Sequence, residues 1–398
     1  MEGEYLNGKK KVLFIAHDNY NRSGAFISMC NLAYYLKVNH QVNVMVILPG
    51  KGNGAEILES LGIEYKIIKS YDWITPVEFN NNYIKMYKQL KKIIKYSFNL
   101  ISIARLIVFI KKYNPSIVHI NTICSYVGAI AAWYCDIPYV WHIREYLEED
   151  QSLKIFYRKN GEKLINHAAC NICISNSVKE KFEKIYPSAK FCRIYNGINT
   201  TKFINLNPEC NDVNHITCVG GLYPHKGQEL LIKAIGNLNY EIRKKIKVHI
   251  VGTGKCLDDL QHLVEKLGLK DSIVFEGFSK APEKFFSSSA ITVVPSYFEP
   301  FGRVTIEAML CNSYVIGSNT AGTKELIGDN EYGALFNCGD YCDLSEKIEF
   351  ALRNPCIIKQ IADKARKMAL EVFTADRNAH MVNELYNTIF KEEENTDV

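Results

Sequence analysis

The chain has 398 residues, of which 47% are apolar and 23% charged. This composition is ordinary for a globular protein, and the length favours two domains because single cores rarely grow past roughly 250–300 residues. Residues 1–200 carry 26 basic and 16 acidic side chains, a balance of +10, whereas residues 201–398 carry 22 and 27, a balance of −5. A basic first half suggests contact with nucleic acid or with an anionic membrane surface.

Thirteen cysteines are scattered along a chain in which we find no secretory leader, which predicts free thiols in a reducing compartment. Cys170 and Cys173 form the only C-x-x-C, but they lie in a β-branched run, which favours a buried strand over a zinc or redox site. No run reaches the roughly 18 uninterrupted apolar residues of a membrane span. We therefore expect a cytoplasmic protein, peripheral on the inner face of the cell membrane if any surface of it binds lipid.

The predicted elements begin with a buried strand at 12–16, a turn at 21–25, a helix at 26–37 and a second strand at 41–48. Gly24 lies in the turn between strand and helix, where backbone amides can meet a phosphate or a substrate hydroxyl. A simple tight turn would use the same glycine, so both interpretations stay open.

Residues 83–113 are predicted to form an unusual amphipathic helix. On a helical wheel its lysines and its apolar residues fall on opposite sides. The lysines are Lys85, Lys88, Lys91, Lys92 and Lys95, and the apolar residues are Met86, Leu90, Ile93 and Ile94. Such a helix could lie in an anionic membrane surface, or it could pack on its own domain with its lysines in solvent.

Two further strands are predicted at 116–120 and 138–145, around a helix at 126–134. His142 stands where the second strand ends, which is a ligand-site position in open α/β sheets, although a histidine there could also serve only to bond the backbone. Residues 200–214 turn to Asn, Pro and Asp without periodicity, so we place the linker between the domains there.

The second domain is predicted to open with a strand at 216–219 and a turn that contains Lys226. A lysine at the tip of such a turn can neutralise a departing diphosphate, or it can simply be solvated. Further on, β-branched runs at 291–294 and 314–317 flank a loop and a short helix. Such a βαβ unit has parallel neighbouring strands, and its helix begins at the carboxyl edge of the sheet.

Two carboxylates bracket the start of that helix. Glu299 lies in the loop and Glu307 about one turn into the helix, so both could reach a ligand there, although Glu307 could instead be solvated. Exposed amides and the helix dipole favour phosphate. A nucleotide-sugar would fit, with its diphosphate near Gly302 and Arg303, where glycine lets the backbone approach closely.

Glu299-Pro300-Phe301-Gly302 followed by Glu307-Ala308-Met309 resembles the E-x7-E signature of retaining GT-B glycosyltransferases, in particular glycosyltransferase family 4. Lys226-Gly227 matches the end of the family's Gly-Arg-Leu-x3-Lys-Gly pattern, but Gly221 replaces its arginine. Arg303 could supply the missing cation, or only its backbone amide could matter.

This resemblance implies an α/β fold of GT-B type, with two doubly wound Rossmann-like domains facing across a cleft. We expect residues 1–207 to form the acceptor-side domain and 208–375 the nucleotide-sugar domain. Residues 376–398 would form a helix that crosses back to the first domain, with a polar tail. The implied activity moves a sugar from a nucleotide-sugar, a UDP-sugar in our expectation, to a saccharide or lipid-linked saccharide. The product would be a bacterial surface polysaccharide, made with retention of configuration.

The resemblance also assigns roles to residues. The expected catalytic residues are Glu299, His142 and Lys226. The expected donor-binding residues are Glu307, Gly302, Arg303, Phe301, Val304 and Gly24. No Asp-x-Asp occurs in the chain, so we expect no metal. For a protein of this family we also expect no other cofactor and no nucleic-acid partner. Three alternatives stay open: a nucleotide-sugar epimerase of the same fold, a phosphorylase that needs pyridoxal phosphate, and a catalytically silent partner protein.

Overall fold

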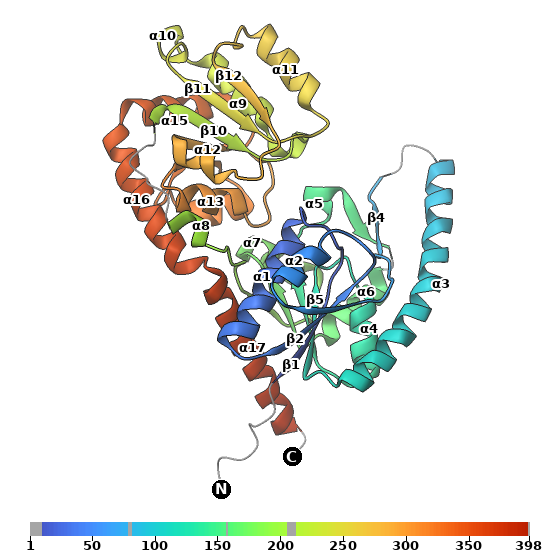
Figure 1. Ribbon diagram of the computed structural model, residues 1–398. Helices are drawn as coiled ribbons and strands as arrows, with labels where there is room; N and C mark the ends of the chain where they lie inside the picture. The colour runs from blue at the N-terminus through green and yellow to red at the C-terminus, as the bar shows by residue number, and fades with distance from the viewer. Residues whose placement is uncertain (1–9, 79–81, 157, 205–211, 397–398) are drawn as a thin grey trace. The chain divides into compact units, whose positions relative to one another are not determined.

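The computed structural model describes residues 10–78, 82–156, 158–204 and 212–396 (Figure 1). The chain divides into two compact units. The first consists of residues 1–198 and 375–398, and the second of residues 199–374. Each unit has its own parallel sheet with helices on both faces, so the predicted pair of doubly wound α/β domains is confirmed.

Among the described residues, the first unit contains a seven-stranded parallel sheet with the order β3-β2-β1-β5-β6-β8-β9. The central strands β5 and β6 are buried along their whole length, which explains why their sequences do not alternate between apolar and polar residues. The strands are β1 (Lys11–Ile15), β2 (Asn43–Leu48), β3 (Glu64–Ile67), β5 (Ile117–Asn121), β6 (Tyr139–Ile143), β8 (Cys170–Cys173) and β9 (Phe191–Arg193).

The helices of this unit are α1 (Gly24–Asn39), α2 (Ala55–Ser60), α3 (Asn82–Tyr113), α4 (Val127–Tyr134), α5 (Glu148–Gln151), α6 (Arg158–His167), α7 (Asn176–Ile185) and α17 (Ala375–Thr396). A small antiparallel ribbon pairs β4 (Ile74–Pro76) with β7 (Leu153–Ile155). Cys170 and Cys173 lie in a fully buried strand, and the twelve cysteines among the described residues are all free thiols.

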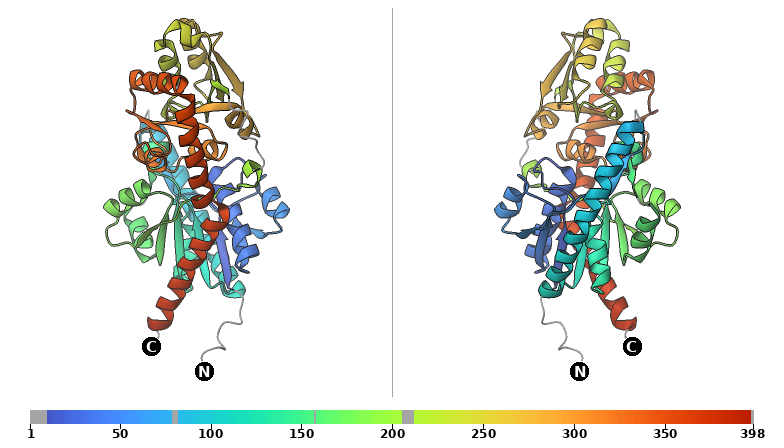
Figure 2. Two further views of the ribbon diagram at one scale, coloured as in Figure 1. Left: turned by 90° about the vertical axis from the view of Figure 1, so that its left-hand side faces the viewer. Right: turned by 90° about the vertical axis from the view of Figure 1, so that its right-hand side faces the viewer.

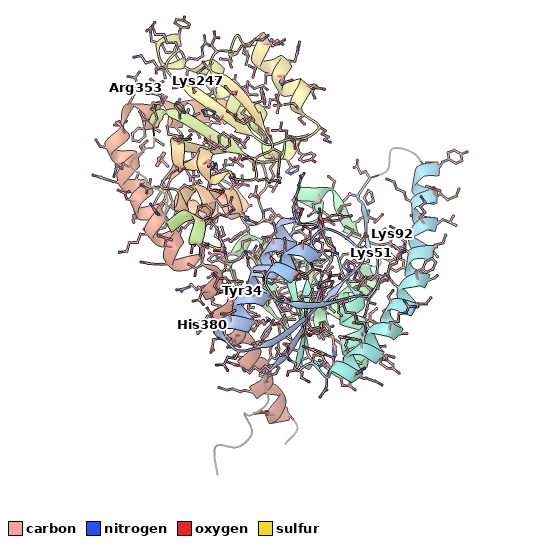
Figure 3. All side chains as sticks on the ribbon, viewed as in Figure 1. Tyr34, Lys51, Lys92, Lys247, Arg353 and His380 are labelled. Carbon is pink, nitrogen blue, oxygen red and sulfur yellow. The ribbon has the colours of Figure 1, made fainter. Side chains whose placement is uncertain are left out.

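The last helix, α17, joins the first unit after the chain has completed the second. Ala375 N donates to Ile198 O at 3.0 Å, and Asn378 Nδ2 donates to Tyr195 O at 2.6 Å. Farther along, α17 packs against α1, and Figure 3 labels Tyr34 and His380 on these two helices. Side chains of α1 and α17 thus share one core cluster on one face of the sheet.

Among the described residues, the second unit contains six parallel strands in the order β12-β11-β10-β13-β14-β15. The strands are β10 (Asp212–Val219), β11 (Lys247–Val251), β12 (Ile273–Gly277), β13 (Ser289–Val294), β14 (Tyr314–Ser318) and β15 (Ala334–Phe336). The helices are α8 (Thr201–Ile204), α9 (Gln228–Asn237), α10 (Tyr240–Arg243), α11 (Leu257–Lys266), α12 (Glu283–Ser288), α13 (Arg303–Leu310), α14 (Ala321–Ile327), α15 (Tyr341–Arg353) and α16 (Pro355–Val372). The predicted βαβ unit is present as β13, α13 and β14.

The boundary between the units falls at Ile198 and Asn199, nine residues before the predicted one. The short helix α8 belongs to the second unit because Phe203 is buried there and its carbonyl accepts from Arg366 Nη2 at 3.2 Å. Much of the predicted linker at 200–214 lies outside the described residues.

Docking of α3 on a membrane through its lysines would require the lysine side to face away from the protein, and this side does not do so fully. Lysines and apolar residues do fall on opposite sides, but Lys92 forms an ion pair with Asp72 and Lys95 Nζ lies 5.2 Å from the centroid of the Tyr71 ring. The lysine side is therefore partly turned toward its own unit, while Leu90 on the apolar side is exposed. The side chain of Lys85 lies outside the described residues. Figure 2 shows α3 running along the outside of the first unit.

Asn99 fastens α3 to this unit. Its side chain is 1% exposed. Its Oδ1 accepts from Tyr71 N at 2.9 Å, and its Nδ2 donates to Tyr71 O at 2.9 Å and to Tyr126 Oη at 2.8 Å. One amide thus satisfies three polar groups on two other segments, the partly buried N–H and carbonyl of Tyr71 and the buried hydroxyl of Tyr126.

Replacing Asn99 by Ala is expected to lower the free energy of unfolding of the first unit by about 2–4 kcal/mol, because those three groups lose their partner. Urea unfolding followed by far-UV circular dichroism would measure the loss. The matched control is Ser97→Ala, an exposed position on the same helix, which should change stability by less than about 0.5 kcal/mol. Equal midpoints for the two variants would contradict this role of Asn99.

Candidate active site

The loops that follow β10 and β13 meet because these strands are parallel neighbours. Tyr297 N in the second loop donates to His225 O in the first at 2.9 Å. Gly227 has a φ of +69°, and a Cβ on it would lie 2.1 Å from Pro295 O. Only glycine allows this approach, so Gly227 fixes the position of Lys226 against the β13 loop.

Lys226 and Glu299 form an ion pair at this junction. The distance from Nζ to Oε2 is 2.7 Å, and the two side chains are only 25% and 17% exposed. The backbone of Glu299 is held as well, because its carbonyl accepts from Gly322 N at 2.9 Å. The structure thus brings together two of the predicted catalytic residues, which are 73 positions apart in the chain.

The N-terminus of α13 lies directly after this loop. Its cap residue, Gly302, has a φ of +88° and offers no side-chain acceptor to the first amides of the helix. Those amides and the helix dipole can therefore interact with an anion. Val304 in the first turn is partly exposed, whereas Phe301 is buried and makes an edge-to-face contact with Phe373, with centroids 6.1 Å apart.

Glu307 and Arg303 form a second ion pair, across one turn of α13. Arg303 Nε donates to Glu307 Oε1 at 2.7 Å, with side-chain exposures of 39% and 10%. Part of the hydrogen-bonding capacity of the guanidinium is thus used by Glu307. A Cβ on Gly221 would lie 2.9 Å from the Tyr223 ring, so an arginine there would require Tyr223 to move. Whether Arg303 supplies the second cation stays a prediction.

A pocket of about 550 Å³ lies beside the Lys226 turn. Tyr223, Gln228 and Tyr297 line it together with side chains of α11. Lys226, Glu299 and Glu307 are not among its described lining residues. We therefore identify the site by the two ion pairs and the α13 amides rather than by this pocket.

Gly24 and His142, the other predicted site residues, belong to the first unit. Gly24 is the exposed first residue of α1, whose cap Ser23 accepts from Phe26 N at 3.3 Å. A Cβ added at Gly24 would meet nothing within 4 Å, so the space above it is open. A ligand contact at Gly24 stays a prediction.

His142 is fully buried near the end of β6. Its Nδ1 lies 3.2 Å from Arg144 Nη2 and 3.1 Å from His119 Nε2. Since arginine can only donate, this Nδ1 accepts, and the proton of His142 sits on Nε2. His119 Nε2 then donates as well, and its Nδ1 accepts from Tyr386 Oη of α17 at 2.6 Å. Direct contact of His142 with a sugar stays a prediction. As a buried acceptor for Arg144 Nη2, His142 can hold the Arg144 guanidinium in its orientation.

Sequence reasoning missed Arg144, which connects three strand ends. Its Nε donates to Asn121 Oδ1 at 2.7 Å, and its Nη1 bonds Asn196 Oδ1. Burial lowers the pKa of Arg144 to about 9, although the nearby Glu145 opposes this shift. The signal was present in the sequence, because two charged residues directly follow the apolar strand 139–143.

Comparison with known proteins identifies the family. "Glycosyltransferase Family 4" matches residues 23–202, and "Glycosyl transferases group 1" matches residues 200–368. An uncharacterized glycosyltransferase of Methanocaldococcus jannaschii is 30% identical over 285 residues, which cover 66% of this chain and 72% of that protein. The chain belongs to glycosyltransferase family 4.

Other relatives of this family 4 glycosyltransferase have more specific names. The capsular polysaccharide biosynthesis glycosyltransferase CapM of Staphylococcus aureus is 26% identical over 90% of this chain and 98% of its own. A Campylobacter jejuni N-acetylgalactosaminyltransferase, named for a diphospho-undecaprenol substrate, is 29% identical over 39% of this chain and 41% of its own. Anabaena HepE, solved in complex with UDP, has a TM-score of 0.76 at 21% identity and covers 96% of this chain and 100% of its own. The fold of the family 4 chain is therefore GT-B, as predicted.

The buried histidines predict a pH dependence of stability. Burial, reinforced by the Arg144 charge, holds the pKa values of His119 and His142 well below the usual value. In the unfolded chain both bind protons below about pH 6.5, whereas in the folded chain they stay neutral. The unfolded state then binds more protons, so stability falls as pH drops through this range, on the order of 1 kcal/mol per histidine and pH unit.

We expect His119→Gln to weaken the loss of stability between neutral pH and about pH 5.5 relative to wild type. Chemical unfolding across this pH range, with a probe of the first unit, measures the slope. His262→Gln on α11 is the matched control, since His262 is exposed and belongs to the second unit. A slope unchanged in His119→Gln would show that His119 is not held neutral.

Proposed function

We propose that this protein is a retaining, metal-independent glycosyltransferase that moves a sugar from a UDP-sugar to a lipid-linked saccharide. The acceptor would serve the synthesis of a bacterial surface polysaccharide, at the cytoplasmic face of the membrane. The observation that carries the proposal is the Lys226–Glu299 ion pair beside the glycine-capped N-terminus of α13. A cation, a carboxylate and available amides in one place suit a diphosphate attached to a sugar.

Each group in the site has a separate role in the proposed reaction. The α13 amides would hold the diphosphate, and Lys226 would neutralise the charge that develops as the bond from the anomeric carbon to the diphosphate oxygen breaks. Glu299 would position the Lys226 ammonium and accept a hydrogen bond from a sugar hydroxyl. Glu307, braced by Arg303, would accept from the nucleotide ribose.

The names of three similar proteins support the proposed donor, acceptor and product. HepE was solved with UDP, the Campylobacter relative is named for a diphospho-undecaprenol substrate, and CapM is named for capsular polysaccharide. Retention of configuration rests on the resemblance of the Glu299 to Glu307 stretch to retaining family 4 enzymes. Metal independence rests on Lys226 and the helix amides as the proposed source of positive charge.

A panel of nucleotide-sugars, each incubated with polyprenyl-diphosphate saccharides, tests the proposal directly. Mass spectrometry identifies the glycosylated product, NMR of its anomeric proton gives the configuration, and a parallel reaction in EDTA tests metal dependence. Conversion of donor without acceptor would indicate an epimerase. An inverted product, or activity abolished by EDTA and restored by a divalent cation, would overturn the corresponding part of the proposal.

Lys226→Met and Glu299→Gln should each lower kcat by a factor on the order of 100 or more, because preorganised charge at the leaving diphosphate is lost or misplaced. The matched control is Lys233→Met, on helix α9 that follows the Lys226 turn, where the lysine pairs with Glu229 at the surface. The loss of kcat in the double variant should be much smaller than the product of the two single losses, since the two side chains act as one unit. Turnover within threefold of wild type in either single variant rejects its assignment.

The second ion pair should act on donor binding. Glu307→Gln is expected to raise the Kd for the nucleotide-sugar, measured by calorimetry, whereas Arg303→Leu should lower turnover. If Arg303 supplies the cation missing at Gly221, adding Gly221→Arg to Arg303→Leu should restore part of the activity. A near-wild-type Arg303→Leu enzyme would leave only the backbone amide as the contact, and unchanged affinity in Glu307→Gln would remove the ribose role.

A further inference from the structure

Helix α3 presents a long apolar face to its surroundings. Ten large apolar side chains of α3 are each more than half exposed. They are Tyr83, Met86, Tyr87, Leu90, Ile93, Ile94, Phe98, Leu100, Ile101 and Val108. The rest of the described chain contributes only fifteen exposed large hydrophobic residues in total. So dense a patch marks an interaction surface.

These side chains form one stripe because they recur at intervals of three and four residues along the helix. The opposite side is buried against the first unit through Asn99, Ser102, Leu106 and Ile110. Ser102 Oγ donates to Lys69 O, and Asn99 is bonded as described above. Residues 86–113 are long and apolar enough to span a bilayer, with 28% of the most apolar window buried. However, spanning would pull these polar contacts into hydrocarbon, which favours a helix that lies on the membrane.

The charges of α3 indicate the chemistry of the partner. The 32-residue helix contains eight basic residues and no acidic one. Lys88 and Lys91 are exposed near its start, and Lys111 and Lys112 near its end, where Lys111 Nζ lies 5.5 Å from the centroid of the Tyr134 ring. Two copies of this helix would bring only like charges together, which opposes self-association. Anionic headgroups complement the cations, and exposed tyrosines are typical of side chains at a membrane–water interface.

We propose that α3 lies in the surface of an anionic membrane, with its apolar stripe at the boundary of the acyl chains and its terminal cations among the headgroups. The apolar side is the contact side, whereas Lys92 and Lys95 serve the fold through Asp72 and Tyr71. Apolar insertion supplies affinity that salt cannot remove, and the cations add a salt-sensitive preference for anionic lipid. This proposal stands apart from the proposed function, since lipid binding needs neither donor nor acceptor.

Sedimentation of the full chain with phosphatidylcholine vesicles, with and without phosphatidylglycerol, tests the proposal. Wild type should bind the anionic vesicles, and the triple variant Leu90→Ser, Ile94→Ser, Ile101→Ser should bind them at least about 100-fold more weakly. The matched control replaces three exposed apolar residues of the second unit, Val274→Ser, Phe278→Ser and Ile357→Ser, and should bind like wild type. Circular dichroism and thermal unfolding confirm that each variant folds.

A charge variant separates the two contributions. Lys91→Gln, Lys111→Gln and Lys112→Gln together should weaken binding to anionic vesicles on the order of 100-fold, with little effect on neutral ones. Because the chain already has three tryptophans, brominated lipid should quench a larger share of the fluorescence in Ile94→Trp than in wild type, whereas Ile357→Trp should be quenched no more than wild type. Wild-type binding by the apolar triple variant, or no binding by wild type, overturns the proposal. A concentration-dependent dimer that the apolar triple abolishes would assign the face to a second copy instead.

Discussion

The parallel pairing of β10 with β13 is the constraint on which the site of the second unit depends. Strands that run in the same direction release their loops at the same edge of the sheet, so the Lys226 turn and the Glu299 loop must meet. The contact of Gly227 with Pro295 O then fixes how closely they meet. Lys226 and Glu299 neutralise each other at this junction, and the chain runs from Glu299 directly into the N-terminus of α13 at Arg303.

Much of this site can be predicted from the sequence because its signals are local. The offset of eight between Glu299 and Glu307 and the glycine before α13 are both visible in one short stretch. The Lys226–Glu299 contact cannot be predicted from the sequence, because it depends on the order of the strands in the sheet. The hydrophobic periodicity of the sequence does not determine that order. The four-residue spacing of Arg303 and Glu307 was readable as a helical ion pair, and it changes how free the Arg303 guanidinium is.

The first unit shows where local patterns fail. The helical wheel of α3 separates lysines from apolar residues correctly, but it cannot tell which side faces the protein. That choice depends on Asp72, Tyr71 and Tyr126, which lie outside the helix and receive Lys92 and Asn99. Likewise, the sequence places Arg144 at a strand end, but its contacts with Asn121 and Asn196 form only when the fold brings the ends of other strands to it. Tyr386 then ties this buried polar group to a helix 267 positions away from His119 in the chain.

Most of the excess positive charge of the first 200 residues lies on one helix. The first 200 residues carry an excess of ten positive charges, and α3 alone supplies eight basic residues with no acidic one. Without this helix the first half would be nearly neutral, with an excess of two. The basic character of the first half is therefore not a diffuse field around the domain. It is concentrated on α3, the helix that also exposes the apolar stripe. Binding of nucleic acid uses cations and has no need of an exposed apolar stripe. The combination of both on one helix therefore favours an anionic lipid surface over nucleic acid.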